Sequence, residues 1–275
     1  MNGLDPGQLA LLVGALVAAG VIAGFAAGLF GIGGGVVIVP ALYHALGALG
    51  YEDERMHVAV ATSLATIIVT SVQSLRTHAA KGAADMALLR AWTPWIVAGA
   101  ALGGVAAGFL PGAGLAAVFG ALALPIAANM AFGSDQWRIA QELPKGASQA
   151  GIACGIGLAS AVMGIGGGAF GVTVMTLCGR PIHQAVGTAA GFGAAIGVPA
   201  VIGYIIGGWG HEGLPPLSLG YVNIPGFIAI GLLTSLMAPV GARAAHRMDK
   251  QLLKRLFAGF LALTACQMLY EAIFA

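Results

Sequence analysis

The chain has 275 residues, of which 59% are hydrophobic and only 8% are charged, with a formal net charge of +2. A soluble domain carries about 25% charged residues, so these few charges cannot form the shell of a soluble core of this size. The small net charge gives no reason to expect a nucleic-acid partner, and the mean hydropathy of +0.92 indicates a protein embedded in the lipid bilayer.

Eight apolar segments follow one another along the chain, and a helix needs about 20 apolar residues to span a bilayer. In chain order they cover residues 9–49, 57–75, 91–110, 113–132, 147–178, 183–207, 221–242 and 256–274. Barrel strands would alternate apolar and polar residues, whereas these segments are continuous, so we predict helices. Residues 1–8 contain no Lys or Arg, and we therefore expect the first segment to be retained rather than cleaved as a signal peptide.

The same five residues interrupt the first and the fifth segment near the middle. The two runs are Gly31-Ile32-Gly33-Gly34-Gly35 and Gly164-Ile165-Gly166-Gly167-Gly168. A second match follows each run, because the stretch from His57 to Thr62 resembles the stretch from His183 to Thr188. Two matches in the same order indicate a duplication of about 130 residues. The alternative is chance similarity between glycine-rich helices.

The Lys and Arg residues predict which loops are cytoplasmic, because short cytoplasmic loops are enriched in both. They gather in segments 76–90, 133–146 and 243–255, whereas segment 208–220 has neither. We predict that the first three are cytoplasmic and the last is external. The fifth apolar segment then begins and ends on the cytoplasmic side, so it must fold back at its glycines. By the repeat, the first segment does the same from the external side.

These predictions describe an all-α polytopic membrane protein with two inverted-topology repeats. Each repeat is a glycine-broken hairpin followed by three transmembrane helices. The first covers residues 1–132 and the second 147–275, with 133–146 as a cytoplasmic linker. Inverted repeats with broken helices recur in secondary transporters, whose substrate binds near the midplane of the membrane. Whether the hairpins cross fully or only dip into the bilayer stays open. We expect a multi-pass protein of the plasma membrane, which in bacteria is the inner membrane.

The glycine runs are the candidate substrate site. A helix that restarts after such a run aims unpaired N–H groups and partial positive charge into the break, and glycine lets a ligand approach closely. Two such ends facing one another would bind a small anion without a basic side chain. The candidate glycines are Gly31, Gly33, Gly34, Gly35, Gly164, Gly166, Gly167 and Gly168. The alternative is that the runs only allow tight packing of the hairpins.

Hydroxyl side chains add to this candidate site. Thr62 and Ser63 lie in an apolar helix after the first run, and Thr188 is the counterpart of Thr62 in the second repeat. One interpretation is that they donate hydrogen bonds to the oxygens of an anion. The other is structural, because hydroxyls in membrane helices also bond to the preceding turn or to a neighbouring helix.

Four further residues are candidates for gating or coupling. His57 and His183 stand at predicted helix starts, where a histidine can serve as a proton-linked gate or cap the interface. Arg76 and His78 belong to a polar cytoplasmic connection that is either a gate or an ordinary solvated loop. H+ is therefore a candidate coupling ion. Paired carboxylates, a serine–histidine–acid set or a metal-ligand cluster are missing from the predicted spans, so we expect no enzyme, no metal and no other cofactor.

The motifs, taken together in order, resemble the TauE/SafE sulfite-exporter family, also called the TSUP permeases. They are the doubled glycine run, Pro40, Ala61-Thr62-Ser63, segments 78–85 and 181–188, Gly203-Tyr204, Leu214-Pro215, and segments 220–223 and 239–246. The resemblance implies a secondary transporter of small anions, often sulfur-containing ones such as sulfite or organosulfonates, and in many members an exporter. An uptake permease, a passive anion channel and a membrane enzyme or assembly subunit are the alternatives, and the oligomeric state stays open.

Overall fold

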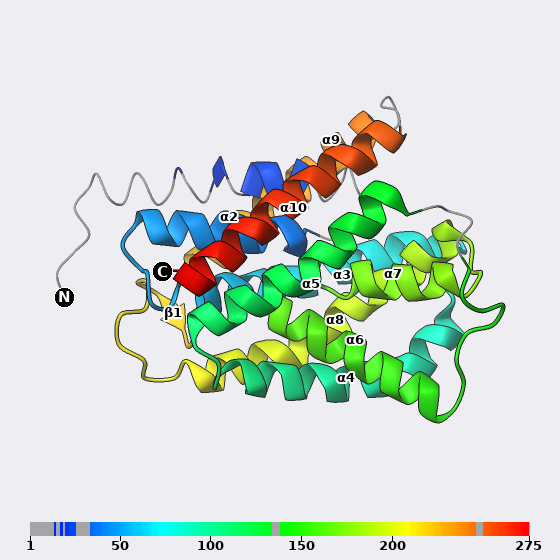
Figure 1. Cartoon of the computed structure of the whole chain (residues 1–275), viewed down its shortest axis with the longest axis horizontal. Coiled ribbons are helices and arrows are strands. Elements are labelled where there is room, and N and C mark those ends of the chain that lie inside the picture. The colour runs from blue at the N-terminus through cyan, green and yellow to red at the C-terminus, as the bar shows by residue number, and fades with distance from the viewer. Residues whose placement is uncertain are drawn as a thin grey trace.

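The structure is a computed structural model, and it describes residues 14, 17–18, 20–25, 34–133, 138–245 and 250–274. This part of the chain is almost entirely helical (Figure 1). The elements are α2 (Gly35–Ala48), α3 (Arg55–Ala80), α4 (Met86–Ala107), α5 (Gly112–Phe132), α6 (Ala147–Met163), α7 (Gly168–Leu177), α8 (Ile182–Gly207), β1 (Ser218–Leu219), β2 (Val222–Asn223), α9 (Ile224–Ala245) and α10 (Lys250–Phe274).

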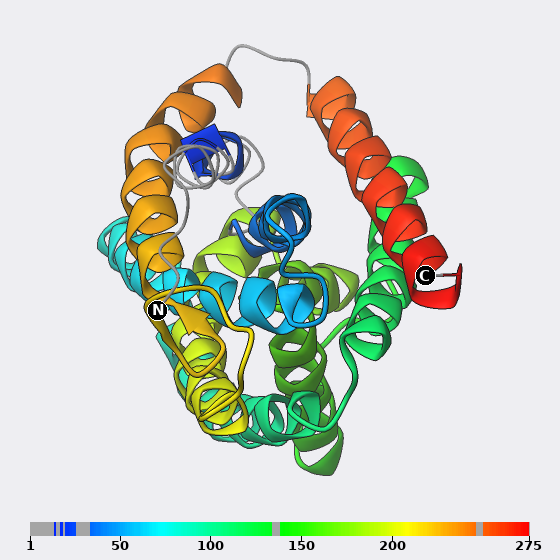
Figure 2. The ribbon, with the colours of Figure 1, turned by 90° about the vertical axis from the view of Figure 1, so that its left-hand side faces the viewer.

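Five of the described helices are long and apolar enough to cross a membrane: α3, α4, α5, α8 and the stretch Arg255–Phe274 of α10. Their outward faces carry large apolar side chains such as Leu102, Ile206 and Leu263, which suit contact with lipid. In the end-on view of Figure 2, α2 lies in the interior of the bundle, between α9 on one side and α5 and α10 on the other. The chain is thus a helical, multi-pass membrane protein.

The fifth apolar segment folds back on itself. Helix α6 ends at Met163, and Gly164 follows in the left-handed region with φ 72°. Gly167, also with φ 72°, precedes α7. The N–H groups of Ile139 and Ala140, in the linker before α6, donate to the carbonyl of Leu177 at the end of α7, at 2.9 and 3.3 Å. The segment therefore starts and finishes at the same end of the bundle.

Helices α2 and α7 extend from their glycine runs toward opposite ends of the molecule (Figure 1). At 1.5 Å per residue, the 14 residues of α2 span about 21 Å. The 10 residues of α7 span about 15 Å. The hydrocarbon core is about 30 Å thick, so neither helix is long enough to cross it alone.

Close helix pairs recur between the two halves of the chain. Helix α3 packs along α8, and α5 packs along α10. Glycines bring α4 and α6 into backbone contact, since a Cβ at Gly99 would fall on the backbone of Cys154. On the other side of the molecule, a Cβ at Gly24 would lie 2.6 Å from the Cα of Thr234 in α9. The two halves of the chain are thus packed against one another along these helix pairs.

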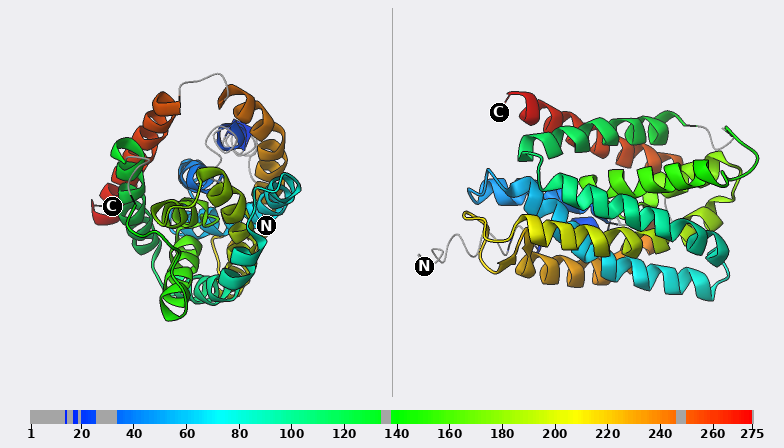
Figure 3. Two further views of the ribbon diagram at one scale, coloured as in Figure 1. Left: turned by 90° about the vertical axis from the view of Figure 1, so that its right-hand side faces the viewer. Right: turned by 90° about the horizontal axis from the view of Figure 1, so that it is seen from below.

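Charge separates the two ends of the bundle. Every described Lys and Arg except Arg55 lies at the end that carries the α3–α4 connection. Figure 3 shows this end opposite the end that holds the 208–220 connection and the C-terminal end of α10. Arg55 lies at the latter, together with Glu52, Asp53, Glu54, Glu212 and Glu271. By the predicted sidedness, the Arg55 end is external, and it is called the outer end below.

Several helix boundaries differ from the sequence prediction. Residues 221–223 are not helical: Leu219 pairs with Val222 in a short antiparallel hairpin, and α9 begins only at Ile224. Segment 76–90 is not a loop either, because α3 continues to Ala80 and α4 begins at Met86. A helix can continue past its apolar stretch into the polar interface of the membrane. The drop in hydropathy along the sequence therefore indicates where the helix leaves the hydrocarbon core, not where the helix ends.

Candidate functional site

The two glycine runs meet inside the protein. A Cβ at Gly35 would lie 2.6 Å from the carbonyl oxygen of Gly164 and 3.1 Å from the Cα of Ile165. Gly34, Gly35, Gly164 and Ile165 are all buried. We call this contact the glycine junction. Gly31 and Gly33, the other candidates of the first run, lie outside the described residues.

The start of α7 forms one wall of the glycine junction. Gly166 and Gly167 are buried, and Gly168 is half-buried at the first position of the helix. The first N–H groups of a helix have no partner within it, so the start of α7 presents free donors here. The surroundings are apolar, since a Cβ at Gly166 would contact Ile67 and one at Gly167 would fall on the end of Ile196. Positive charge from the helix end is therefore little screened by water.

Two serine hydroxyls lie at this junction. Ser63, a sequence-predicted candidate, donates to the carbonyl of Gly164 at 2.9 Å, so it ties α3 to the glycine run. Ser160 lies one turn before the break in α6 and is 0% exposed. Its Oγ has no hydrogen-bond partner within the described part of the chain, and it lies 3.7 Å from the Cβ position of Gly167. The sequence analysis missed Ser160, although its place one turn before the second glycine run is a usable signal.

The repeated threonines have protein partners in this conformation. Thr62 Oγ1 accepts a hydrogen bond from the backbone N–H of Asn223 at 3.0 Å. Thr188 Oγ1 accepts one from the N–H of Asp85 at 2.9 Å and donates to the carbonyl of Gln184. Both threonines are fully buried. Each threonine therefore holds in place (pins) the segment before a helix of the other half of the chain, α9 for Thr62 and α4 for Thr188.

The pinned residues are themselves equivalent. Asp85 caps the start of α4 by accepting from Leu88 N–H, and Asn223 caps the start of α9 by accepting from Gly226 N–H. Each follows a glycine with positive φ by three residues, namely Gly82 and Gly220. This Gly-x-x-Asp/Asn match is a third internal correspondence between the halves, which the sequence analysis did not use as part of the repeat.

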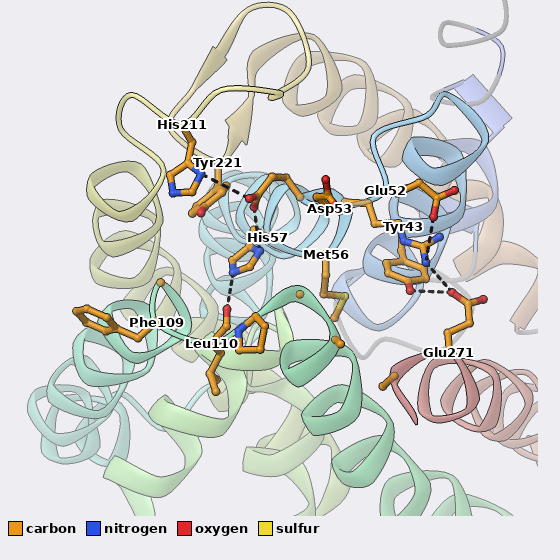
Figure 4. Close-up of a pocket in the computed structure, with 17 residues that line it drawn as sticks. Tyr43, Glu52, Asp53, Met56, His57, Phe109, Leu110, His211, Tyr221 and Glu271 are labelled. Carbon is orange, nitrogen blue, oxygen red and sulfur yellow. Dashed lines mark hydrogen bonds and ion pairs between the residues drawn. The ribbon is translucent and has the colours of Figure 1, made fainter. Parts of the chain in front are cut away.

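A cavity of about 660 Å³ opens at the outer end (Figure 4). One wall holds Arg55, whose guanidinium lies 3.0 Å from Glu271 and 4.2 Å above the ring of Tyr43. Tyr43 also donates to Glu271, at 2.7 Å. This cluster joins α2, α3 and α10 at the mouth of the cavity.

His57 forms part of the other wall of the cavity. Its ring is stacked on Tyr221 with centroids 4.6 Å apart, and its Nδ1 lies 3.2 Å from Glu54 Oε2. The remaining gating candidates lie elsewhere: His183 is exposed at the opposite end, and Arg76 and His78 occupy the last turns of α3. Of the four, only His57 is placed in a cavity in the described structure.

Comparison with known proteins gives a consistent picture. The family model described as "Sulfite exporter TauE/SafE" matches residues 16–268. A "Probable membrane transporter protein" of Haemophilus influenzae is 36% identical over 263 residues, covering 94% of this chain and 97% of that protein. The "Probable membrane transporter protein MJ0441" of Methanocaldococcus jannaschii is 26% identical over 265 residues, covering 95% and 97%. No solved structure matches the chain.

Proposed function

Because the chain belongs to the sulfite exporter TauE/SafE family and is a membrane transporter, we propose that it is a secondary carrier that exports a small sulfur-containing anion such as sulfite or an organosulfonate. The substrate binds where the two glycine runs face one another, once rocking of the halves separates them from the contact seen here. One observation carries this proposal: α2 and α7 start at two glycine runs that touch at Gly35 and Gly164, and they extend from there in opposite directions.

The chemistry of the glycine junction suits an anion. Each helix start carries about half a positive charge, and backbone N–H groups at such ends bind sulfate- and phosphate-like groups without basic side chains. Ser160 supplies an additional buried hydroxyl without a partner among the described residues. A hydroxyl in this position can donate to an anion oxygen, as hydrogen bonds to charged groups are the stronger ones.

Alternating access by two inverted repeats is part of the same proposal. The reciprocal packing of α3 with α8 and of α5 with α10 supports it, as do the exchanged contacts of Thr62 with Asn223 and of Thr188 with Asp85. Rocking of one half against the other would open the glycine junction to each side in turn. Moving one charge across 100 mV is worth about 2.3 kcal/mol, so an interior-negative potential favours anion export.

Flux measurements in proteoliposomes test the proposal. Wild-type protein should carry radiolabelled sulfite or sulfoacetate with saturable kinetics and show counterflow. Gly167→Ala should lower this flux, because Gly167 has φ 72° and a Cβ there would fall on Ile196. Gly155→Ala is the matched control, since a Cβ at Gly155 meets nothing within 4 Å. Equal flux in all three proteins would refute the glycine site, and flux that does not saturate would favour a passive channel.

A further inference from the structure

The cavity at the outer end holds a histidine whose protonation is dictated by its neighbours. His57 Nε2 lies 3.0 Å from the carbonyl oxygen of Leu110 and 3.3 Å from that of Ala107. A carbonyl oxygen can only accept a hydrogen bond, so Nε2 must carry a hydrogen. Nδ1 is then the only nitrogen of this ring that can bind or release a proton.

Nδ1 faces a carboxylate at close range. It lies 3.2 Å from Glu54 Oε2, within ion-pair distance, and neither atom has a hydrogen-bond partner in the described parts of the chain. The His57 side chain is only 5% exposed. A bare nitrogen lone pair close to a carboxylate oxygen in a buried place is repulsive, and a proton bound to one of the two atoms relieves that repulsion.

We propose that Glu54 and His57 form a proton-binding site at the outer end, and that the occupancy of this site is coupled to transport of the anion. The inference rests on the proposed function and names its second substrate, H+. Protonation makes Nδ1–H and an imidazolium beside the carboxylate, and deprotonation returns the neutral ring with its hydrogen on Nε2. Only a proton moves between the site and water in this step.

Burial disfavours the charged form of His57, whereas the carboxylate of Glu54 and the carbonyls of Leu110 and Ala107 favour it. The ring lies over Tyr221, and aromatic faces attract cations. The carbonyls at the end of α4 add the partial negative charge of a helix C-terminus. Burial, together with the charge of Glu54 and a hydrogen bond to it, raises the pKa of Tyr221 to about 12. Tyr221 therefore keeps its hydroxyl proton at physiological pH.

A path to external water passes over His211. Its Nδ1 lies 3.5 Å from Glu54 Oε1, and its side chain is 49% exposed. Figure 4 shows His211, Tyr221 and His57 grouped along one wall of the cavity. The other titratable groups that line it are Glu52 and Asp53, from the same turn as Glu54, and Tyr43 and Glu271, which bond to one another at the opposite wall. Arg55 is engaged with Glu271 at 3.0 Å, so it does not neutralise Glu54.

The site joins both halves and has no counterpart in the second repeat. Glu54 and His57 belong to the first half, whereas His211 and Tyr221 come from the connection between α8 and α9. In the second repeat His183 is exposed, and Arg180 stands where the first repeat has Glu54. Gain or loss of the proton therefore changes a contact between the halves at one end of the protein only.

Coupling is measured in proteoliposomes with a trapped pH-sensitive dye and radiolabelled sulfite. If one proton is coupled to each anion, a gradient of one pH unit shifts the equilibrium ratio of anion concentrations inside and outside the vesicle about tenfold. Wild-type protein and His183→Gln should show this shift and a proton flux that follows the anion flux. His57→Gln and Glu54→Gln should still carry sulfite but lose both effects. Full coupling in both variants, or wild-type sulfite flux that ignores the pH gradient, would overturn the proposal.

A second measurement does not depend on transport. ¹⁵N NMR of histidine-labelled protein in nanodiscs, with His57 assigned from His57→Gln, reads the protonation of each ring nitrogen. Nε2 should stay protonated at all pH values, and only Nδ1 should titrate, with a midpoint that falls in Glu54→Gln. A His57 signal with bare Nε2, or a midpoint that Glu54→Gln leaves unchanged, would refute the site. Absence of wild-type flux with every anion tested would instead refute the proposed function.

Discussion

The glycine junction leaves no room for a single added carbon atom at Gly35. In Gly35→Ala, the new Cβ would lie 2.6 Å from the Gly164 carbonyl oxygen, 2.7 Å from Ile67 Cδ1 and 3.1 Å from the Ile165 Cα. The Ile67 methyl can rotate away, but the two backbone atoms belong to the facing glycine run. The start of α2 must therefore move away from the break before α7.

Overpacking of a tight core costs about 1–3 kcal/mol. If only the conformation in which the runs touch is destabilised, its population relative to the other conformations falls about 5- to 150-fold. We expect Gly35→Ala to lower both the melting temperature in detergent and the rate of anion flux in proteoliposomes. Gly155→Ala, on the open face of α6, should melt no lower than wild type, since alanine is favoured over glycine in a helix by about 1 kcal/mol.

Similar melting temperatures and similar anion flux in these two alanine variants would refute the reasoning. Wild-type melting and wild-type flux in Gly35→Ala would mean that the runs are not packed together in the membrane. Equal losses in both variants would mean that any alanine in these helices is harmful, whatever space surrounds it.

Three further predictions follow from hydroxyl groups. Ser160→Ala should slow anion flux without lowering the melting temperature, because the Ser160 hydroxyl has no partner among the described residues. Thr62→Val should lower the free energy of unfolding by about 1–3 kcal/mol, because it leaves the buried N–H of Asn223 unpaired. Tyr221→Phe should reduce the fall of the melting temperature at alkaline pH. The pKa of Tyr221 is raised to about 12, so its neutral hydroxyl contributes stability below pH 10 that is lost as the pH rises to about 12.

Each of these predictions has its own check. For Ser160→Ala, the exposed Ser235→Ala is the control, and unchanged flux would remove Ser160 from the site. For Thr62→Val, Thr70→Val is the comparison, since Thr70 only donates to carbonyls of its own helix; equal melting of the two would contradict the pinning role. For Tyr221→Phe, the melting temperature is followed between pH 9 and pH 12, and a curve parallel to that of wild type would be the contrary result.

The sequence predicted the features that depend on local pattern. Continuous apolar stretches predicted a helical membrane protein. The glycine run at 164–168 predicted the break between α6 and α7, and the break forms there because two of these glycines adopt positive φ. The end of α3 could not be read from hydropathy, since the helix continues to Ala80 beyond its apolar stretch. The β-hairpin before α9 was missed because two-residue strands leave no periodic signal.

Features that depend on distant partners were beyond the sequence. The likeness of Thr62 and Thr188 was visible, but their hydrogen bonds to Asn223 and Asp85 join segments more than 100 residues apart. The setting of His57 requires the turn after α4 and the connection before α9 to meet at one place. Binding of substrate by the candidate glycines and hydroxyls stays a prediction.

The glycine junction as the anion site is tested most directly by locating a bound anion. Selenite has the shape of sulfite and scatters X-rays anomalously, so crystals grown with it would reveal its position. We expect an anomalous peak within hydrogen-bond distance of the backbone N–H groups at Gly167 and Gly168 and of Ser160 Oγ. A peak only beside Arg55 in the outer cavity, with none between the glycine runs, would contradict it.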